Sequence, residues 1–246
     1  MSDDASLYLQ DRLDSIQRRL SGQLSFAARN LATGESIQLD DSRIYPTASV
    51  FKIPVMVEVY RQCEAGVLDL SQRVTLQADD VVRGSGILRD IRTGAELTVA
   101  DLVMLMIIVS DNTATNMLID LVGGIDPINS TMQKIGLNDT RVNSKIDFGY
   151  IGDDNRKLAV SSPRDLLQLV EGLAEGTVVS SQSSEAMLDV LGRQHYLNQF
   201  PRFVRYNPYG PELGKPQDIW IGCKTGGLPG MRADAGLIKL PDGISI

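Results

Sequence analysis

Residues that bind metals or form disulfides are scarce in this sequence of 246 residues. It has one histidine, His195, so a site with several histidine ligands is excluded and we expect no bound metal. Its two cysteines, Cys63 and Cys223, cannot form a disulfide framework and do not lie at a zinc-binding spacing. We expect both to be free side chains in the core, and we expect no cofactor.

Features of nucleic-acid-binding and membrane proteins are also lacking. Aromatic residues make up 5% of the chain, and 24 basic against 31 acidic residues give a net charge of −7. No apolar run approaches the roughly 20 residues that a membrane-spanning helix needs. We therefore expect neither a nucleic-acid partner nor a membrane span. Because the acidic start has no secretory signal, we expect a cytoplasmic protein, or a periplasmic or secreted one if a leader has been removed.

The composition is otherwise that of a globular protein with a sizeable core. Hydrophobic residues make up 43% and charged residues 22% of the chain. At roughly 100–200 residues per domain the length allows one large domain or two small ones, and no repeat or linker divides the chain. We expect residues 1–246 to form a single domain. Nothing in the sequence predicts the oligomeric state.

Hydrophobic periodicity predicts both helices and strands. Spacing typical of helices occurs over 7–20, 49–66, 99–109, 113–122 and 163–174. Alternation typical of strands occurs over 24–39, as a hairpin, and over 219–223 and 235–240. A turn over 241–243 precedes what we expect to be the start of another strand at 244–246.

This order of elements predicts an α+β fold, arranged as an α/β sandwich. Strands from the two ends of the chain, about 1–45 and 215–246, would form one antiparallel sheet. The part between them, about 46–214, would form a helical subdomain packed against that sheet.

The first candidate for chemistry is an S-x-x-K motif, Ser49 to Lys52, at the start of a predicted helix. Residues three apart share a helix face, so the Lys52 amine can lie beside the Ser49 hydroxyl. A serine hydroxyl is a weak nucleophile until a neighbouring base or cation activates it, and a desolvated lysine can do so. Taken alone the motif is weak, because a surface lysine one turn after a capping serine gives the same pattern.

The second candidate, Ser110-Asp111-Asn112, directly follows the apolar helix predicted over 99–109. Polar residues at this point must reach water, cap the next helix or line a cleft. Capping by Asp111 is the simpler alternative. In the catalytic alternative the Ser110 hydroxyl passes a proton to a leaving group, and the Asn112 amide holds a substrate carbonyl.

The third candidate, Lys224-Thr225-Gly226-Gly227, lies at the end of a predicted strand. A solvated lysine followed by a turn is the ordinary explanation. If the strand edge lies beside Ser49, Lys224 and Thr225 can instead bind a substrate carboxylate. The glycines would then let backbone N–H groups form part of an oxyanion hole.

Together the three motifs resemble those of the class A β-lactamases and penicillin-binding proteins, an active-site serine hydrolase family. The resemblance extends from about Leu9 to the end of the chain, through TASVFKIPVMVEVYR, MIIVSDNTATNMLIDLVGG and GCKTGGLPGMRADAGLI. It implies a β-lactamase-like fold, with a further C-terminal strand and helix that this sequence does not contain. It also implies acyl transfer, without a cofactor, on a small molecule that is a β-lactam, a peptide or an ester.

The same resemblance implies roles for the reacting residues. Ser49 would be the acylated nucleophile and Lys52 its activator. Ser110 would relay a proton, and Asn112 would orient Lys52 and the substrate amide.

For substrate binding, the resemblance implies Lys224 and Thr225 as the carboxylate site. Gly226 and Gly227 would complete the substrate-binding edge, and the N–H groups of Gly227 and of the nucleophile would form the oxyanion hole. Arg232, on the strand that follows, is at a place where some relatives have a carboxylate-binding arginine.

One element of the family pattern is absent. Class A β-lactamases carry E-x-x-L-N in the loop before the Ser-Pro helix, and its glutamate activates the water that hydrolyses the acyl-enzyme. Between Arg141 and Pro163 this sequence has no glutamate. Asp147 is the nearest carboxylate, and a solvated loop residue is its simpler role. Losing a well-placed base costs about 10²- to 10⁴-fold in the step it serves, so we expect slow deacylation.

Two functional alternatives stay open: an esterase or D-alanyl peptidase that turns over few β-lactams, and a non-catalytic penicillin-binding sensor that is trapped by its ligand. Two other motifs predict less. His195 is expected in a loop rather than in a Ser-His-Asp triad, because no G-x-S-x-G motif is present. The stretch from Arg83 to Gly86 lacks the lysine of a phosphate loop and is expected to form a turn at the rim of the cleft.

Overall fold

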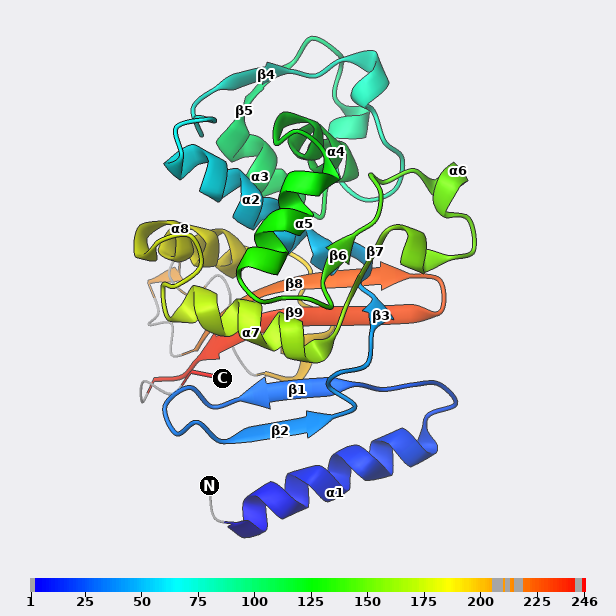
Figure 1. Ribbon diagram of the computed structural model, residues 1–246, viewed down its shortest axis with the longest axis vertical. Helices are drawn as coiled ribbons and strands as arrows, with labels where there is room; N and C mark the ends of the chain where they lie inside the picture. The colour runs from blue at the N-terminus through cyan, green and yellow to red at the C-terminus, as the bar shows by residue number, and fades with distance from the viewer. Residues whose placement is uncertain (1–2, 205–209, 211–212, 215–218, 242–244) are drawn as a thin grey trace.

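The computed structural model describes residues 3–204, 210, 213–214, 219–241 and 245–246. A cluster of helices lies on one side of a long β-hairpin, and a second hairpin with the N-terminal helix lies on the other side (Figure 1). The predicted α+β class is therefore confirmed.

The α-helices within the described residues include every helix that the sequence predicts, and three more. They are α1 (Asp3–Arg19), α2 (Lys52–Glu64), α3 (Val99–Ile108), α4 (Asn112–Leu121), α5 (Ile125–Lys134), α6 (Phe148–Ile151), α7 (Pro163–Ala174) and α8 (Ser181–Gly192). The shorter 3₁₀ turns are η1 (Ala48–Phe51), η2 (Ala78–Asp80), η3 (Leu88–Asp90), η4 (Asn155–Lys157) and η5 (Phe200–Phe203).

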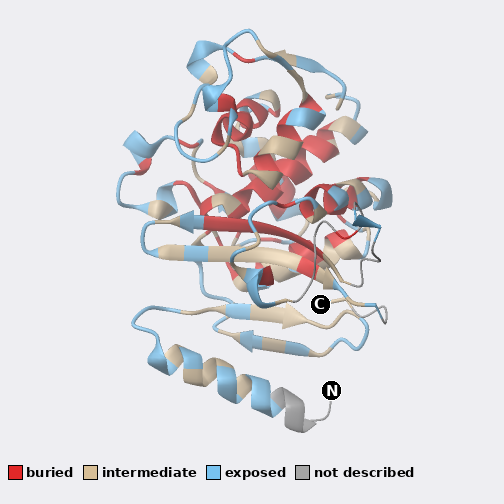
Figure 2. Cartoon of the chain, turned by 180° about the vertical axis from the view of Figure 1, so that it is seen from behind, coloured by how far each residue is buried: buried red, intermediate tan, exposed pale blue. Residues whose placement is uncertain are grey.

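Helix α2 lies at the centre of the helical cluster, and α3, α4, α5 and α8 all pack against it. Its residues from Lys52 to Tyr60 are all buried, and most of them are apolar. Figure 2 shows that burial is concentrated in this cluster and in the strand next to it, whereas α1 is largely exposed. The first residues of α2 are therefore held rigidly by packing.

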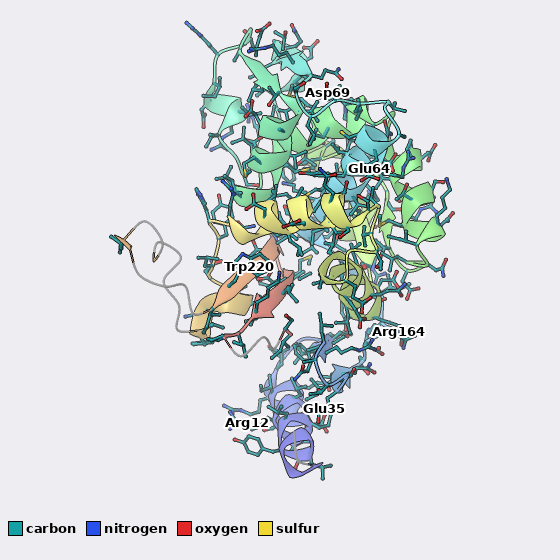
Figure 3. The ribbon with its side chains drawn as sticks, turned by 90° about the vertical axis from the view of Figure 1, so that its left-hand side faces the viewer. Arg12, Glu35, Glu64, Asp69, Arg164 and Trp220 are labelled. Carbon is teal, nitrogen blue, oxygen red and sulfur yellow. The ribbon has the colours of Figure 1, made fainter. Side chains whose placement is uncertain are left out.

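The hairpin beside the cluster consists of β8 (Trp220–Leu228) and β9 (Met231–Lys239). The strands pair antiparallel from Trp220 with Lys239 to Leu228 with Met231, so Pro229 and Gly230 form a two-residue turn. Both strands are longer than the sequence pattern predicts, because cross-strand pairing continues through the glycines that interrupt the alternation. Helix α8 packs on β8 through the Trp220 ring, which fills the space left by Gly192 and Gly222 (Figure 3).

The second hairpin consists of β1 (Phe26–Arg29) and β2 (Ser36–Leu39), as predicted. Within the described residues, each hairpin is paired as its own two-stranded sheet, and strands from both chain ends lie next to each other, as predicted (Figure 1). The two are linked by the last residues of the chain. Ile246 exchanges two backbone hydrogen bonds with Ile238 of β9, and the Ser245 carbonyl accepts one from Leu31, after β1. The turn predicted over 241–243 lies mostly outside the described residues.

The middle of the chain, expected to be helical, also contains short strands. They are β3 (Tyr45–Pro46), β4 (Arg73–Thr75), β5 (Glu96–Thr98), β6 (Arg141–Val142) and β7 (Ala159–Ser161). Strands β6 and β7 flank the loop that contains α6, and β7 also pairs with β3, just before η1. These strands are two or three residues long, too short to produce a recognisable period in the sequence.

Helix α1 packs along β2 at the far end of the molecule (Figure 1). Several of its apolar side chains are exposed, among them Leu7, Tyr8 and Ile16. Within the described part of the chain, no helix combines the length and the apolar character needed to cross a membrane.

Candidate active site

The S-x-x-K motif lies where η1 runs into α2. Ser49 is partly exposed, whereas Ala48, Val50 and Phe51 around it are buried. Ala48 has a φ of 44°, a left-handed conformation that is rare for a residue other than glycine. Strain of this kind persists only where the surrounding packing enforces it, and it is concentrated at functional sites.

The Lys52 side chain is completely buried, so its amine depends on protein atoms for hydrogen bonds. Lys52 Nζ donates to the Ser110 carbonyl at 2.6 Å, to Ser110 Oγ at 3.1 Å and to Asn112 Oδ1 at 2.9 Å. The first motif is thus joined to the second by three hydrogen bonds. A surface position for Lys52, the ordinary explanation of the motif, is wrong.

The second motif is the tight turn between α3 and α4. Ser110 has a φ of 54° and is buried, like the two residues that follow it. Asp111 caps α4, because its Oδ1 accepts a hydrogen bond from the Ala114 N–H at 2.9 Å. Capping by Asp111 is therefore confirmed, and it leaves Ser110 and Asn112 free to contact Lys52.

Asp111 also binds the backbone of residues 87–88, where η3 begins. Its Oδ2 accepts hydrogen bonds from the N–H groups of Ile87, at 2.6 Å, and Leu88, at 2.8 Å. With the Ala114 bond on Oδ1, both carboxylate oxygens are used by backbone donors, and the residue is 1% exposed.

Replacing Asp111 with asparagine is expected to destabilise the protein by about 1 to 3 kcal/mol. Asparagine has the same shape, but one of its two terminal groups is a donor, so in either orientation an NH₂ group faces a backbone N–H. Urea denaturation measures the change in the free energy of unfolding. The control is Asp153→Asn at an exposed loop position, expected to change it by less than about 0.5 kcal/mol. Equal stability of the two variants would contradict the hydrogen bonds assigned to Asp111.

The third motif lies on β8, against the backbone around Ser49. Lys224 is completely buried, and its Nζ donates to the Thr225 carbonyl at 2.8 Å. Gly226 has no room for a side chain, because a Cβ there would lie 2.6 Å from the Thr47 carbonyl oxygen and 3.0 Å from the Ser49 nitrogen. The strand edge therefore lies beside Ser49, as the catalytic alternative requires.

Burial lowers the pKa of both lysines of the site. Burial lowers the pKa of Lys52 well below its usual value; the charge of Lys224 lowers it further, and that of Asp111 partly offsets this. Burial also lowers the pKa of Lys224, to about 8, although the nearby Asp234 carboxylate opposes the shift. The shift favours the neutral Lys52 amine, the form that can accept a proton, whereas a pKa of about 8 leaves Lys224 largely cationic at neutral pH.

The sequence analysis missed Asp234, which pairs with Thr225 across the hairpin. Burial raises the pKa of its carboxyl group to about 6. Its Oδ2 accepts a hydrogen bond from the Phe200 N–H at 3.0 Å, whereas Oδ1 is buried with no hydrogen-bond partner among the residues that the structure describes. The Pro229-Gly230 turn was the available signal, because a two-residue turn there sets the register that places Asp234 opposite Thr225.

Two further predicted residues, Arg232 and Asp147, are both exposed. Arg232 is exposed on β9, opposite Gly227, and its guanidinium donates to the carbonyls of Leu228 and Met231. Asp147 is exposed and caps α6, accepting hydrogen bonds from the N–H groups of Gly149 and Tyr150.

The histidine and the two cysteines take no part in this group of side chains. His195 is an exposed loop residue, as predicted. Cys63 and Cys223 are both free, with Cys223 fully buried and Cys63 only partly. Among the residues that the structure describes, no cluster of His, Cys, Asp and Glu side chains could hold a metal ion.

Comparisons with known proteins give related sequences over most of the chain. A family model described as "Beta-lactamase enzyme family" matches residues 8–246. A β-lactamase of Streptomyces cellulosae is 25% identical over 96% of this chain and 73% of its own length. β-Lactamase L2 of Stenotrophomonas maltophilia is 29% identical, but that match covers 54% of this chain and 44% of L2.

Solved structures are similar over nearly the whole chain. The crystal structure of a β-lactamase from Sphaerobacter thermophilus has a TM-score of 0.85 and 33% identity, covering 96% of this chain and 84% of that one. The structure of PBP-A has a TM-score of 0.83 and 27% identity, covering 97% and 84%. A variant of PBP-A, solved as an acyl-enzyme complex with penicillin G, has a TM-score of 0.82 with the same identity and coverage.

Proposed function

Because this chain belongs to the β-lactamase enzyme family, we propose that it is a serine hydrolase that acts through an acyl-enzyme on Ser49. The observation that carries the proposal is the buried Lys52 amine. It lies one helical turn after Ser49 and is hydrogen-bonded to both Ser110 and Asn112. The substrate would be a small molecule with a reactive carbonyl: a β-lactam, a peptide or an ester.

In the proposed acylation step the neutral Lys52 amine removes the proton from the Ser49 hydroxyl. Ser49 Oγ then attacks the substrate carbonyl carbon, and the oxygen that becomes negative accepts hydrogen bonds from the N–H groups of Ser49 and Gly227. As the C–N bond breaks, the Ser110 hydroxyl gives its proton to the leaving nitrogen and receives the one held by Lys52. No proton is gained or lost overall.

Substrate binding is assigned to the β8 edge. Lys224 and Thr225 would bind a carboxylate of the substrate, because a buried ammonium attracts an anion more strongly than an exposed one. Because Gly226 has no side chain, β8 can approach the proposed nucleophile closely enough for Lys224 and Thr225 to bind that carboxylate. Arg232 is exposed at the end of the same hairpin and could contribute its charge to the same carboxylate.

We propose that hydrolysis of the acyl-enzyme is slow. The Asn116 side chain bonds the backbone N–H and carbonyl of Ile146, each at 2.9 Å, which fixes the loop just before Asp147. The Asp147 carboxylate is then used to cap α6 and is exposed, so it is not a buried base poised to activate water. This observation favours penicillin binding with little turnover, as in a penicillin-binding protein or sensor, over efficient β-lactamase activity.

Two reagents distinguish these functions. We expect a chromogenic cephalosporin to give a single burst of about one equivalent per protein molecule, and a fluorescent penicillin to give a labelled band that persists for many minutes. Steady turnover of the cephalosporin would instead indicate a β-lactamase with an unidentified base. Absence of both signals, with hydrolysis of an activated ester, would indicate an esterase.

The pH dependence of acylation is expected to be bell-shaped. The rate should fall at low pH, where Lys52 becomes protonated, and at high pH, where Lys224 loses its charge near its pKa of about 8. Since the Asp234 carboxylate raises the pKa of Lys224, Asp234→Asn should move the alkaline limb to lower pH. Labelling rates from pH 5 to 10 measure both limbs. An alkaline limb that Asp234→Asn leaves in place would contradict the assignment of that limb to Lys224.

A further inference from the structure

The turn from Arg83 to Gly86 touches the group of residues around Lys52. Ser85 Oγ lies 2.8 Å from the Ser110 carbonyl oxygen and 3.2 Å from Asn112 Oδ1, so its single proton can be donated to either. These are two of the three atoms that accept hydrogen bonds from Lys52 Nζ. The Ser85 hydroxyl and the Lys52 amine therefore share the same two acceptors.

The position of Ser85 is set by the glycines on either side of it. Gly84 and Gly86 have φ values of 104° and 106°. A Cβ on Gly84 would lie 2.6 Å from Asn112 Nδ2, and a Cβ on Gly86 would overlap Asp111. Only glycines at these two positions let the backbone of the turn approach so closely.

Backbone hydrogen bonds tie the turn to the same residue. The Asn112 N–H donates to the Ser85 carbonyl at 3.0 Å, and Asn112 Nδ2 donates to the Arg83 carbonyl at 3.0 Å. With its amide nitrogen used in this way, the Asn112 side chain is fixed with Oδ1 toward Lys52 and Ser85. The backbone of the turn thus fixes the Ser85 hydroxyl beside two of the acceptors of Lys52.

We propose that Ser85 is a positioning residue for Lys52, whose hydroxyl takes over an acceptor that the lysine releases when it loses a proton. This rests on the function proposed above, in which Lys52 must be neutral to act as a base. An ammonium has three N–H donors and can serve all three of its acceptors; a neutral amine has two donors and a lone pair that must face Ser49.

The released acceptor must be one that another donor can satisfy. Ser110 Oγ can rotate and donate in turn, but the Ser110 carbonyl and Asn112 Oδ1 accept only. A buried acceptor without a donor is costly, and the hydroxyl of Ser85 lies within reach of either one. Ser85 thereby stabilises the neutral form of Lys52, which the charge of Lys224 also favours and the charge of Asp111 opposes.

The test compares Ser85→Ala with Ser85→Thr, which keeps the hydroxyl. In Ser85→Ala we expect the acid limb of the acylation profile to move up by about one pH unit, so that acylation slows about tenfold below the limb and recovers at higher pH. Ser85→Thr should restore the original limb. Ser71→Ala, at an exposed turn where the hydroxyl donates to Asp69, is the control and should leave the profile unchanged.

A direct titration separates failure of this inference from failure of the proposed function. The ¹³Cε resonance of Lys52, assigned by its absence in Lys52→Met, should titrate at higher pH in Ser85→Ala than in the unsubstituted protein, whether or not the protein hydrolyses anything. An unchanged Lys52 titration would overturn the proposal. So would a loss of acylation in Ser85→Ala that is equal at every pH, because a merely structural turn would give that result.

Discussion

Replacing Lys52 with methionine is expected to slow acylation by about 10²- to 10⁴-fold, the usual effect of removing a general base from the step it serves. Methionine has a similar length and is apolar, so it suits a completely buried position. The Ser49 hydroxyl would remain in place but would lose the base proposed to accept its proton. Stopped-flow labelling with a fluorescent penicillin measures the rate constant.

The matched control for this prediction is Lys145→Met. Lys145 is an exposed lysine paired with Asp120, and removing it should leave the acylation rate within about twofold, because surface ion pairs contribute little. If Lys52→Met were acylated as fast as the control, Lys52 would not be the base, and the role of the buried amine would have to be structural.

Gly226→Ala is expected to slow acylation by about 10²-fold, the effect of displacing reacting groups by about 1 Å. The new Cβ would lie 2.6 Å from the Thr47 carbonyl oxygen and 3.0 Å from the Ser49 nitrogen. Both are backbone atoms, so either β8 or the start of η1 must move. Overpacking of this kind should also lower the free energy of unfolding by about 1 to 3 kcal/mol.

The neighbouring glycine provides the comparison. A Cβ on Gly227 would meet Arg232 at 3.6 Å, an ordinary van der Waals contact with a flexible side chain. Gly227→Ala should therefore lose much less activity and stability than Gly226→Ala. Equal losses in the two variants would show that the close approach of β8 to Ser49 is not what positions the nucleophile.

The residues of the candidate site were predictable because each one lies at a local signal. Ser49 precedes a largely apolar helix, and Asp111 caps α4. Two glycines follow Lys224 and Thr225. Such signals depend on residues that are close in the sequence, so they can be recognised without knowing how the rest of the chain folds. Three of them in a fixed order were enough to indicate the family.

Residues that act through long-range pairing were not predictable in the same way. Asp234 acquires its surroundings only when β9 pairs with β8, and the Ser85 hydroxyl only when the turn packs on Asn112. The order of strand pairing was not predictable for a related reason. Periodicity shows that strands exist but says little about which strands pair, and among the described residues Ser245 and Ile246 join the two hairpins.

The central claim is that Ser49 becomes covalently acylated, and mass spectrometry tests it most directly. After incubation with penicillin G, the intact protein should gain the full mass of one penicillin, and peptide mapping should place that mass on Ser49. The Ser49→Ala protein should gain nothing. A modified peptide that lacks Ser49, or an unchanged adduct in the Ser49→Ala protein, would contradict the account.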